Sequence, residues 1–246
     1  MTRRPYRSIA FIVAGLALFL AANPAYAQGL ATLDAILQAH HAWPVPPSSD
    51  IITGTSAKTG KSADFKITAT NLEETIIESG DQKQVTTAKG IVFKDEGQKV
   101  QYSPVPSGFG QLDMTGVFFV AQLSRRAVQV DPPQKTTVQG APGYRIRVSQ
   151  ERSQVHFGLS RVTDVCDLLV TEAGLLVGVS RLFYDDQPFR YTQTFVFGEY
   201  RETNKVLLPY QIQVLVKGRL TETIQISSYE FDVPTPTTLF EPRRSK

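Results

Sequence analysis

Residue types that carry out most enzyme chemistry are scarce in this sequence. It contains three histidines, His40, His41 and His156, and a single cysteine, Cys166. His40 and His41 are adjacent, so on a helix their side chains would point about 100° apart, which disfavours joint ligation of one metal ion. No H-E-x-x-H-like pair and no cysteine partner accompanies His156. We therefore expect no metal site.

Nucleophilic chemistry also lacks a recognisable motif. No serine lies in a G-x-S-x-G elbow, and Cys166 lies within the expected strand DVCDLLV, where we interpret it as a small buried hydrophobe. The glycines follow no G-x-G-x-x-G or P-loop pattern and are expected in turns. We expect no catalytic residue and no cofactor. An uncharacterised hydrolase stays as the least favoured alternative, because a triad including His156 could still converge in space.

The N-terminal residues have the layout of a secretory signal peptide. Arg3, Arg4 and Arg7 precede an apolar run from Ile9 to Ala22, and small residues follow up to Ala27. The alternative is an uncleaved membrane anchor, but this run is shorter than the roughly 20 residues that a spanning helix needs. We predict that residues 1–27 are removed after Ala27. The mature chain would then be periplasmic or secreted, with no stable transmembrane segment.

The net charge changes once the predicted signal peptide is removed. The full sequence has 26 basic and 23 acidic side chains, and residues 1–27 hold three arginines and no acidic residue. The mature chain is therefore formally neutral, with 23 side chains of each sign. This balance gives no indication of a nucleic-acid partner.

Two segments show the spacing of helices. In LATLDAILQAHHAW, apolar residues recur at spacings of three and four, which predicts an amphipathic helix over about 29–43, ended by the prolines from Pro44 onward. In GQLDMTGVFFVAQLSRRAV, a similar stripe predicts a second helix over about 113–125. The letters GVFFVAQL could also form a short buried strand, which periodicity alone does not distinguish from a helix.

The rest of the chain has the alternation of antiparallel strands. Short runs rich in Val, Ile, Thr, Phe and Tyr are separated by Gly, Asp, Asn and Pro, and connections such as 172–174 and 217–218 are short enough for hairpins. We therefore predict a single domain over 28–246. Its fold class is mainly β (α+β): a curved antiparallel sheet or incomplete β-barrel with one or two helices on the concave side.

Several strands are more apolar than a sheet with one solvated face requires. In FRYTQTFVFGEY, Tyr191, Phe195 and Phe197 share one parity, interrupted only by Gln193. The segment DVCDLLVTEAGLLVGVSRLFY is apolar on both parities, which indicates strands covered on both faces. The sheet should therefore curl around its own helices, its far edge or a ligand.

The order of these elements, with the strand motif KVLLPYQI and the closing LFEP, resembles the bacterial outer-membrane lipoprotein-sorting carriers, the LolA/LolB-like superfamily. The resemblance is strongest over roughly the last 90 residues. It implies an incomplete, strongly curved antiparallel β-barrel whose helices pack against the concave side. It also implies an apolar cavity that receives acyl chains.

These observations predict an exported protein of the cell envelope that binds or carries a hydrophobic ligand, such as a lipid or the acyl chain of a lipoprotein. Binding would be driven by burial of apolar area, on the order of 0.8 kcal/mol per CH₂ group. The alternative is a non-catalytic module with a self-filled core that binds an envelope protein partner. The candidate ligand-lining residues are Phe118, Phe119, Tyr191, Phe195, Phe197, Tyr210 and Ile212.

Overall fold

The computed structural model describes residues 24–42, 47–58, 60–70, 74–79, 82–87, 90–95, 98–103, 116–152, 162–184 and 190–236. Most of the predicted signal peptide, residues 1–23, lies outside these ranges, as does His156. Among the described residues, no helix has the length and apolar character needed to cross a membrane.

Two helices and fourteen strands make up the described fold. The helices are α2 (Pro24–Ala39) and α3 (Val117–Leu123). The strands are β1 (Ser49–Lys58), β2 (Lys61–Thr70), β3 (Glu74–Ser79), β4 (Gln82–Thr87), β5 (Gly90–Asp95), β6 (Gln98–Ser103), β7 (Gln129–Val130), β8 (Gln134–Val138), β9 (Ala141–Arg152), β10 (Val162–Thr171), β11 (Leu176–Tyr184), β12 (Arg190–Thr203), β13 (Val206–Val216) and β14 (Arg219–Phe231).

All strands belong to one antiparallel sheet. Its order is β6-β5-β4-β3-β2-β1-β14-β13-β12-β11-β10-β9-β7, and β8 pairs with β9. Most strands pair with their neighbours in sequence. The exceptions are β7, which pairs with β9, and β1, which pairs with β14 and brings the two halves of the chain together. The predicted fold class, a mainly β curved antiparallel sheet with helices, is confirmed.

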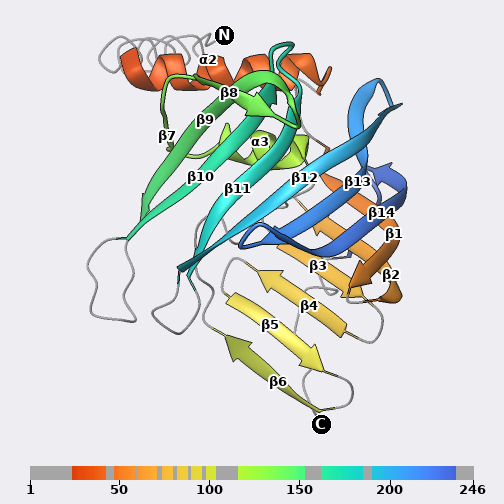
Figure 1. Ribbon diagram of the computed structural model, residues 1–246. Helices are drawn as coiled ribbons and strands as arrows, with labels where there is room; N and C mark the ends of the chain where they lie inside the picture. Colours follow the sequence, from red (N-terminus) through yellow and green to blue (C-terminus); the bar gives the residue numbers. More distant parts are fainter. Residues whose placement is uncertain are drawn as a thin grey trace, which may run out of the picture.

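The sheet curls so that one of its faces is concave. Figure 1 shows α2 lying across one end of the curled sheet and α3 inside the curve, below α2. Every residue of α3 is buried, and α2 contacts both α3 and β7. The β13–β14 hairpin lies at the opposite end of the curve, as do the start of β10, the end of β11 and the start of β12 (Figure 1). We call this opposite end, on the concave side, the mouth.

Strand register determines which side chains meet on the concave face. Val179, Phe195 and Val214 lie opposite one another across β11, β12 and β13, and all three are buried. We call this set the inner row. Phe197 and Ile212 form the neighbouring pair on the side of α3. Because side chains alternate between faces, these apolar residues share the concave face.

A β-bulge accompanies the junction between the two halves of the chain. The register of β1 and β14 shifts at Thr53/Gly54, leaving Ser227 as the extra residue of β14. An added Cβ at Gly54 would lie 2.1 Å from the backbone oxygen of Gln225, so only glycine fits this close approach. Bulges bend strands and increase their twist, which is consistent with the curvature seen here.

Both helices differ from their predicted ranges at their ends. α3 begins at Val117, four residues later than expected, because Gly116 adopts a φ of 70° where the chain turns against Pro209. α2 ends at Ala39, where His40 turns toward the sheet, and it begins at Pro24. The predicted cleavage site after Ala27 falls inside α2, and cleavage itself stays a prediction.

Candidate functional site

The fold brings five of the predicted lining residues into one apolar core. Phe118 and Phe119 of α3 are fully buried, and Phe195 and Phe197 of β12 and Ile212 of β13 are almost fully buried. All five belong to the same cluster of contacting side chains. The chain therefore fills the concave face next to α3 with its own side chains.

Tyr210 lies at the edge of this cluster. Its ring is half-buried and contacts Tyr229 edge-on, with 5.5 Å between the ring centroids. The guanidinium carbon of Arg201 lies 4.5 Å from the Tyr210 ring centroid, and the Tyr210 hydroxyl is 2.8 Å from the hydroxyl of Thr203. The polar end of Tyr210 is thus already engaged within the protein. Tyr191 pairs with Phe183 in the sheet, but its side chain lies outside the described residues.

Sequence reasoning missed two aromatic residues that hold α3. Phe118 packs against Tyr229 and Phe231 of β14, with centroid distances of 6.5 Å and 6.1 Å. Tyr229 and Phe231 also pack against each other at 6.3 Å, and the Tyr229 hydroxyl donates to the backbone oxygen of Pro209. The signal in the sequence was SSYEFDV, where two aromatics of one parity end the last strand.

The character of the concave face changes at the mouth. Arg181 and Gln193 face one another across β11 and β12, next to the inner row, and Val216 of β13 continues their row. The Gln193 amide oxygen accepts from Arg181 Nη2 at 2.8 Å and from Nε at 3.1 Å. The Arg181 guanidinium carbon lies 5.2 Å from the Phe195 ring centroid. Arg181 is only 9% exposed, so a charged group is held at the boundary of an apolar surface.

Three further strands bring polar groups to the mouth. Glu222 of β14 lies opposite Val214, and Ser56 of β1 donates to a Glu222 carboxylate oxygen at 2.5 Å. On β10, Asp164 is 8% exposed and shares its parity with Cys166, which pairs with Arg181. The concave face is therefore apolar toward α3 and polar at the mouth.

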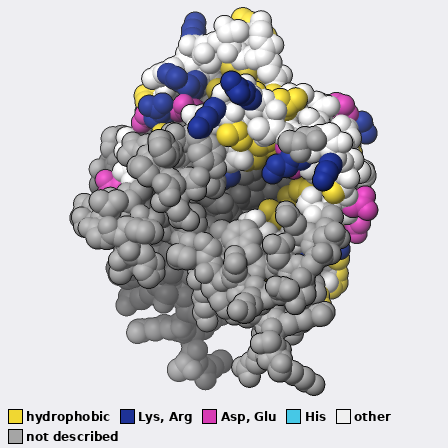
Figure 2. Space-filling view, turned by 60° about the horizontal axis from the view of Figure 1, so that its bottom comes forward, with side chains coloured by type: hydrophobic (Ala, Val, Ile, Leu, Met, Phe, Trp, Pro, Cys, Tyr) yellow, Lys and Arg dark blue, Asp and Glu magenta, His cyan; other side chains and the backbone are white. Residues whose placement is uncertain are grey.

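The space-filling view looks at the molecule from below the orientation of Figure 1, and so toward the mouth. It shows a hollow near the centre of this face, with hydrophobic side chains inside it (Figure 2). Lys and Arg side chains gather on the described surface beside the hollow. On its described side, the hollow thus combines apolar side chains with basic side chains beside them.

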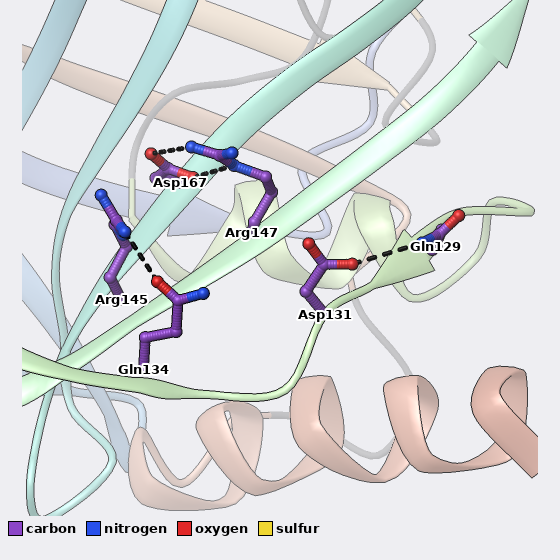
Figure 3. Close-up of polar contacts among 6 residues, drawn as sticks. All are labelled: Gln129, Asp131, Gln134, Arg145, Arg147 and Asp167. Carbon is purple, nitrogen blue, oxygen red and sulfur yellow. Dashed lines mark hydrogen bonds and ion pairs between the residues drawn. The ribbon is translucent and has the colours of Figure 1, made fainter.

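The outer faces of the same strands carry exposed polar pairs. Arg147 of β9 donates from Nε and Nη2 to the two carboxylate oxygens of Asp167 on β10, at 2.9 Å and 3.3 Å (Figure 3). Arg145 of β9 donates to Gln134 of β8 at 2.6 Å. These contacts are typical of a solvated sheet face, and they contrast with the buried inward-facing residues of β9 and β10.

A surface depression of about 410 Å³ lies over β1, β2 and β3. It is lined by Thr53, Gly54, Thr55, Asp64, Phe65, Lys66, Glu78 and Ser227. Thr53, Lys66 and Glu78 are register partners on the face opposite that of buried Ile52 and Ile67. This depression is therefore on the outer side of the sheet, and it includes none of the predicted lining residues.

Cys166 and His40 have structural roles in this fold. Cys166 is buried, and burial raises the pKa of its thiol, which disfavours the reactive thiolate. The ring of His40 lies 2.8 Å through Nδ1 from the backbone oxygen of Leu207 and accepts through Nε2 from the backbone N–H of Leu176 at 2.9 Å. Burial lowers the pKa of His40, which favours the neutral ring that this arrangement needs. Among the described residues, no group of three or more His, Cys, Asp or Glu side chains could hold a metal ion.

Comparison with known proteins reveals the fold but no close relative. No protein-family model matches the sequence, and no curated protein matches it. A DUF1329 family protein from Desulfovibrio piger ATCC 29098 superposes with a TM-score of 0.58 and 12% identity, over 88% of this chain and 97% of the other. The LolA superfamily protein NE2245 from Nitrosomonas europaea superposes with a TM-score of 0.53 and 9% identity, over 87% and 97% of the two chains. This chain has the LolA fold.

The LolA fold confirms the resemblance that KVLLPYQI and LFEP indicated, at the level of architecture. The sequence identities of 12% and 9% are too low for a function to be transferred. What this LolA-fold protein does must therefore be argued from its own concave face.

Proposed function

We propose that this protein is an exported binding or carrier protein of the cell envelope for a hydrophobic ligand, such as a lipid or the acyl chain of a lipoprotein, and that it carries out no chemical step. The observation that carries the proposal is the concave face. A continuous apolar surface leads from the mouth through the inner row to α3, inside a LolA-type curved sheet. An elongated apolar molecule entering at the mouth would meet this surface first.

Ligand binding would be driven by apolar burial along the inner row. An acyl chain that enters the concave face would have its methylene groups removed from water, each contributing on the order of 0.8 kcal/mol. Of the inner-row residues, Phe195 lies next to Arg181 at the mouth, so it would be the first aromatic contact of an entering chain.

A second candidate function is supported by the burial of α3. Because Phe118 and Phe119 are fully buried and Phe118 packs against Tyr229 of β14, the helix already occupies the deep part of the concave face. A protein whose concave face is filled in this way could act as an interaction module that binds an envelope protein. The two candidates differ in whether an acyl chain can enter past the mouth.

The test is ligand recovery followed by displacement. The mature protein, residues 28–246, is purified from its own host and extracted for mass spectrometry of bound lipids, and the delipidated protein is titrated with a fluorescent acyl probe. We expect recovered lipid and saturable probe binding. Protein that is free of lipid and does not bind the probe would exclude the carrier function and leave the interaction module.

A matched pair of variants tests whether the probe binds at the mouth. Val216→Trp puts a large side chain in the row of Arg181 and Gln193, whereas Leu215→Trp puts the same side chain on the opposite face of β13. We expect Val216→Trp to weaken probe binding at least tenfold and Leu215→Trp to leave it within about twofold. Equal effects of the two substitutions would show that the probe binds elsewhere.

A further inference from the structure

The mouth has an excess of basic residues, although the predicted mature chain is formally neutral. By register, Lys58 pairs with both Lys61 and Glu222, which places Lys58 and Lys61 on the concave side at the end of the β1–β2 hairpin. Arg219 pairs with Val216, so it lies in line with the row of Arg181. Lys58, Lys61 and Arg219 are exposed.

The described ionisable residues of the mouth carry a net positive charge. The basic residues are Lys58, Lys61, Arg181 and Arg219, and the acidic residues are Asp164 and Glu222. Glu222 is held in place by the hydroxyl of Ser56. Basic groups that surround a partly apolar opening raise the local concentration of anions and strengthen their binding.

Arg181 differs from the other basic residues because it is inside the mouth. The residue is 9% exposed, and its guanidinium is bonded to the amide oxygen of Gln193 and placed over the ring of Phe195. The amide of Gln193 and the ring of Phe195 are among the groups that contact it. A guanidinium has five N–H donors in a planar fork that matches the geometry of phosphate and carboxylate, and it binds these anions more strongly away from bulk water.

We propose that the mouth is a subsite for the anionic, phosphate-bearing head group of an amphiphile whose chain lies along the inner row. Arg181 is the anchor for the phosphate, and Lys58, Lys61 and Arg219 form the exposed basic rim around it. This inference rests on the proposed function, because the head group is positioned by a chain that enters the concave face. It adds the chemical class of the ligand, a phosphate-bearing lipid rather than a neutral one.

The experiment compares amphiphiles that have the same chain and different head groups. Dodecyl phosphate, dodecyl maltoside and dodecyltrimethylammonium are each used to displace a fluorescent acyl probe from delipidated protein. We expect dodecyl phosphate to bind roughly tenfold or more tightly than the other two, since hydrogen bonds to a charged partner are the stronger ones. We also expect this preference to weaken as salt concentration rises.

Substitutions test whether the mouth is responsible for the preference for dodecyl phosphate. Arg181→Met keeps an unbranched side chain over Phe195 but removes the charge, and we expect it to abolish most of the preference for dodecyl phosphate. Arg145→Gln removes a positive charge from the outer face of β9 and should leave the preference unchanged. If Arg181→Met does not fold, the exposed double variant Lys61→Gln/Arg219→Gln supplies the test, with an expected loss of about threefold or more.

The outcomes separate this inference from the proposed function. If none of the three amphiphiles displaces the probe, the proposed function fails. If all three bind equally to the wild type, the concave face binds chains without distinguishing head groups, and the inference of a head-group subsite is overturned. If inorganic phosphate alone abolishes the preference at millimolar concentration, the mouth is a site for free phosphate and the inference is likewise overturned.

Discussion

At the scale of single residues, the buried side chain of His40 is explained by the backbone groups around it. His40 connects the end of α2 to two strands, through Leu207 of β13 and Leu176 of β11, and its ring packs 5.6 Å from that of Tyr200. The Leu207 N–H also donates to the backbone oxygen of His40 at 2.9 Å. The bond from Leu176 therefore requires that Nε2 carry no proton, whereas the two contacts with Leu207 do not.

The protonation of His40 predicts a dependence of stability on pH. Its pKa is lowered in the folded protein by burial, opposed by its bond to Leu207, while His41 also lowers it. The unfolded chain therefore takes up a proton at a higher pH, near 6.5, than the folded protein does. The contribution of His40 to the free energy of unfolding is fully present above pH 6.5 and decreases as pH falls below it, by at most about 1.4 kcal/mol per pH unit.

This dependence is measured by urea unfolding at pH 7.5, 6.5 and 5.5. In His40→Gln, the free energy of unfolding should depend less on pH, because the contribution of His40 is gone. His41→Gln, at the exposed neighbour, should keep the dependence of the wild type. A slope that is the same in the wild type and in His40→Gln would mean that other groups account for the acid sensitivity.

Cys166 gives a second prediction at this scale. Because its thiol is buried and its pKa is raised, a thiol reagent should modify the native protein only as fast as the strand around it opens. The denatured protein should react completely within minutes. Labelling followed by intact-mass measurement distinguishes the two, and rapid stoichiometric labelling of the native state would contradict the described burial.

At the scale of elements, α3 and the β1–β14 junction determine the shape of the concave face. α3 has seven residues, too few to be stable alone, and all of them are buried. Its position depends on contacts with Tyr229 and Phe231 at the end of the last strand. The junction depends on the close approach of Gly54 to β14. Both features join segments that are more than a hundred residues apart.

Truncating the aromatic anchor of α3 should cost much of the stability of the protein. Phe118→Ala removes a fully buried ring, which typically lowers the free energy of unfolding by about 3–5 kcal/mol. Leu220→Ala removes a side chain that is 57% exposed and should change it by less than about 0.5 kcal/mol. Urea denaturation of both variants is the measurement. A small effect of Phe118→Ala would indicate that α3 is only loosely held on the sheet.

Gly54 allows a second test at the element scale. In Gly54→Ala, the added Cβ would lie 2.1 Å from a backbone oxygen of β14, so the junction must shift, at a cost of about 1–3 kcal/mol or more. Gly198→Ala is the matched control, since its nearest contact would be at 3.6 Å to a flexible glutamine side chain. Thermal unfolding should separate the two variants clearly. Similar melting temperatures would show that the bulge is adaptable.

At the scale of the whole molecule, a single curved sheet encloses an apolar face that is covered by helices at one end and reaches the mouth at the other. A ligand that binds the folded protein and not the unfolded chain raises the free energy of unfolding, by about 2.7 kcal/mol at a concentration of 100 times its Kd. We therefore expect dodecyl phosphate to raise the melting temperature in a concentration-dependent manner. The Val216→Trp variant should show little increase. An equal increase in both proteins would indicate binding outside the mouth.

The sequence alone predicted the mainly β architecture, the antiparallel pairing and the two helical segments, because period and turn chemistry are local properties. It also indicated the apolar face of β12, with Phe195 and Phe197 on one parity. The importance of Gln193 was visible only as an interruption of that face. Tyr229 and Phe231 were missed because nothing local to SSYEFDV indicates contact with a helix a hundred residues earlier.

Only the tertiary structure determined how these surfaces are used. Alternation assigns side chains to faces, but sheet curvature and the packing of α3 determine that Phe118 and Phe119 fill the concave face rather than line an open cavity beside α3. Register across six strands brings Arg181, Glu222, Lys58, Lys61 and Arg219 to one mouth, although they are widely separated in sequence. Long-range strand pairing creates that proximity, and it depends on bulges and close approaches that local sequence patterns do not encode.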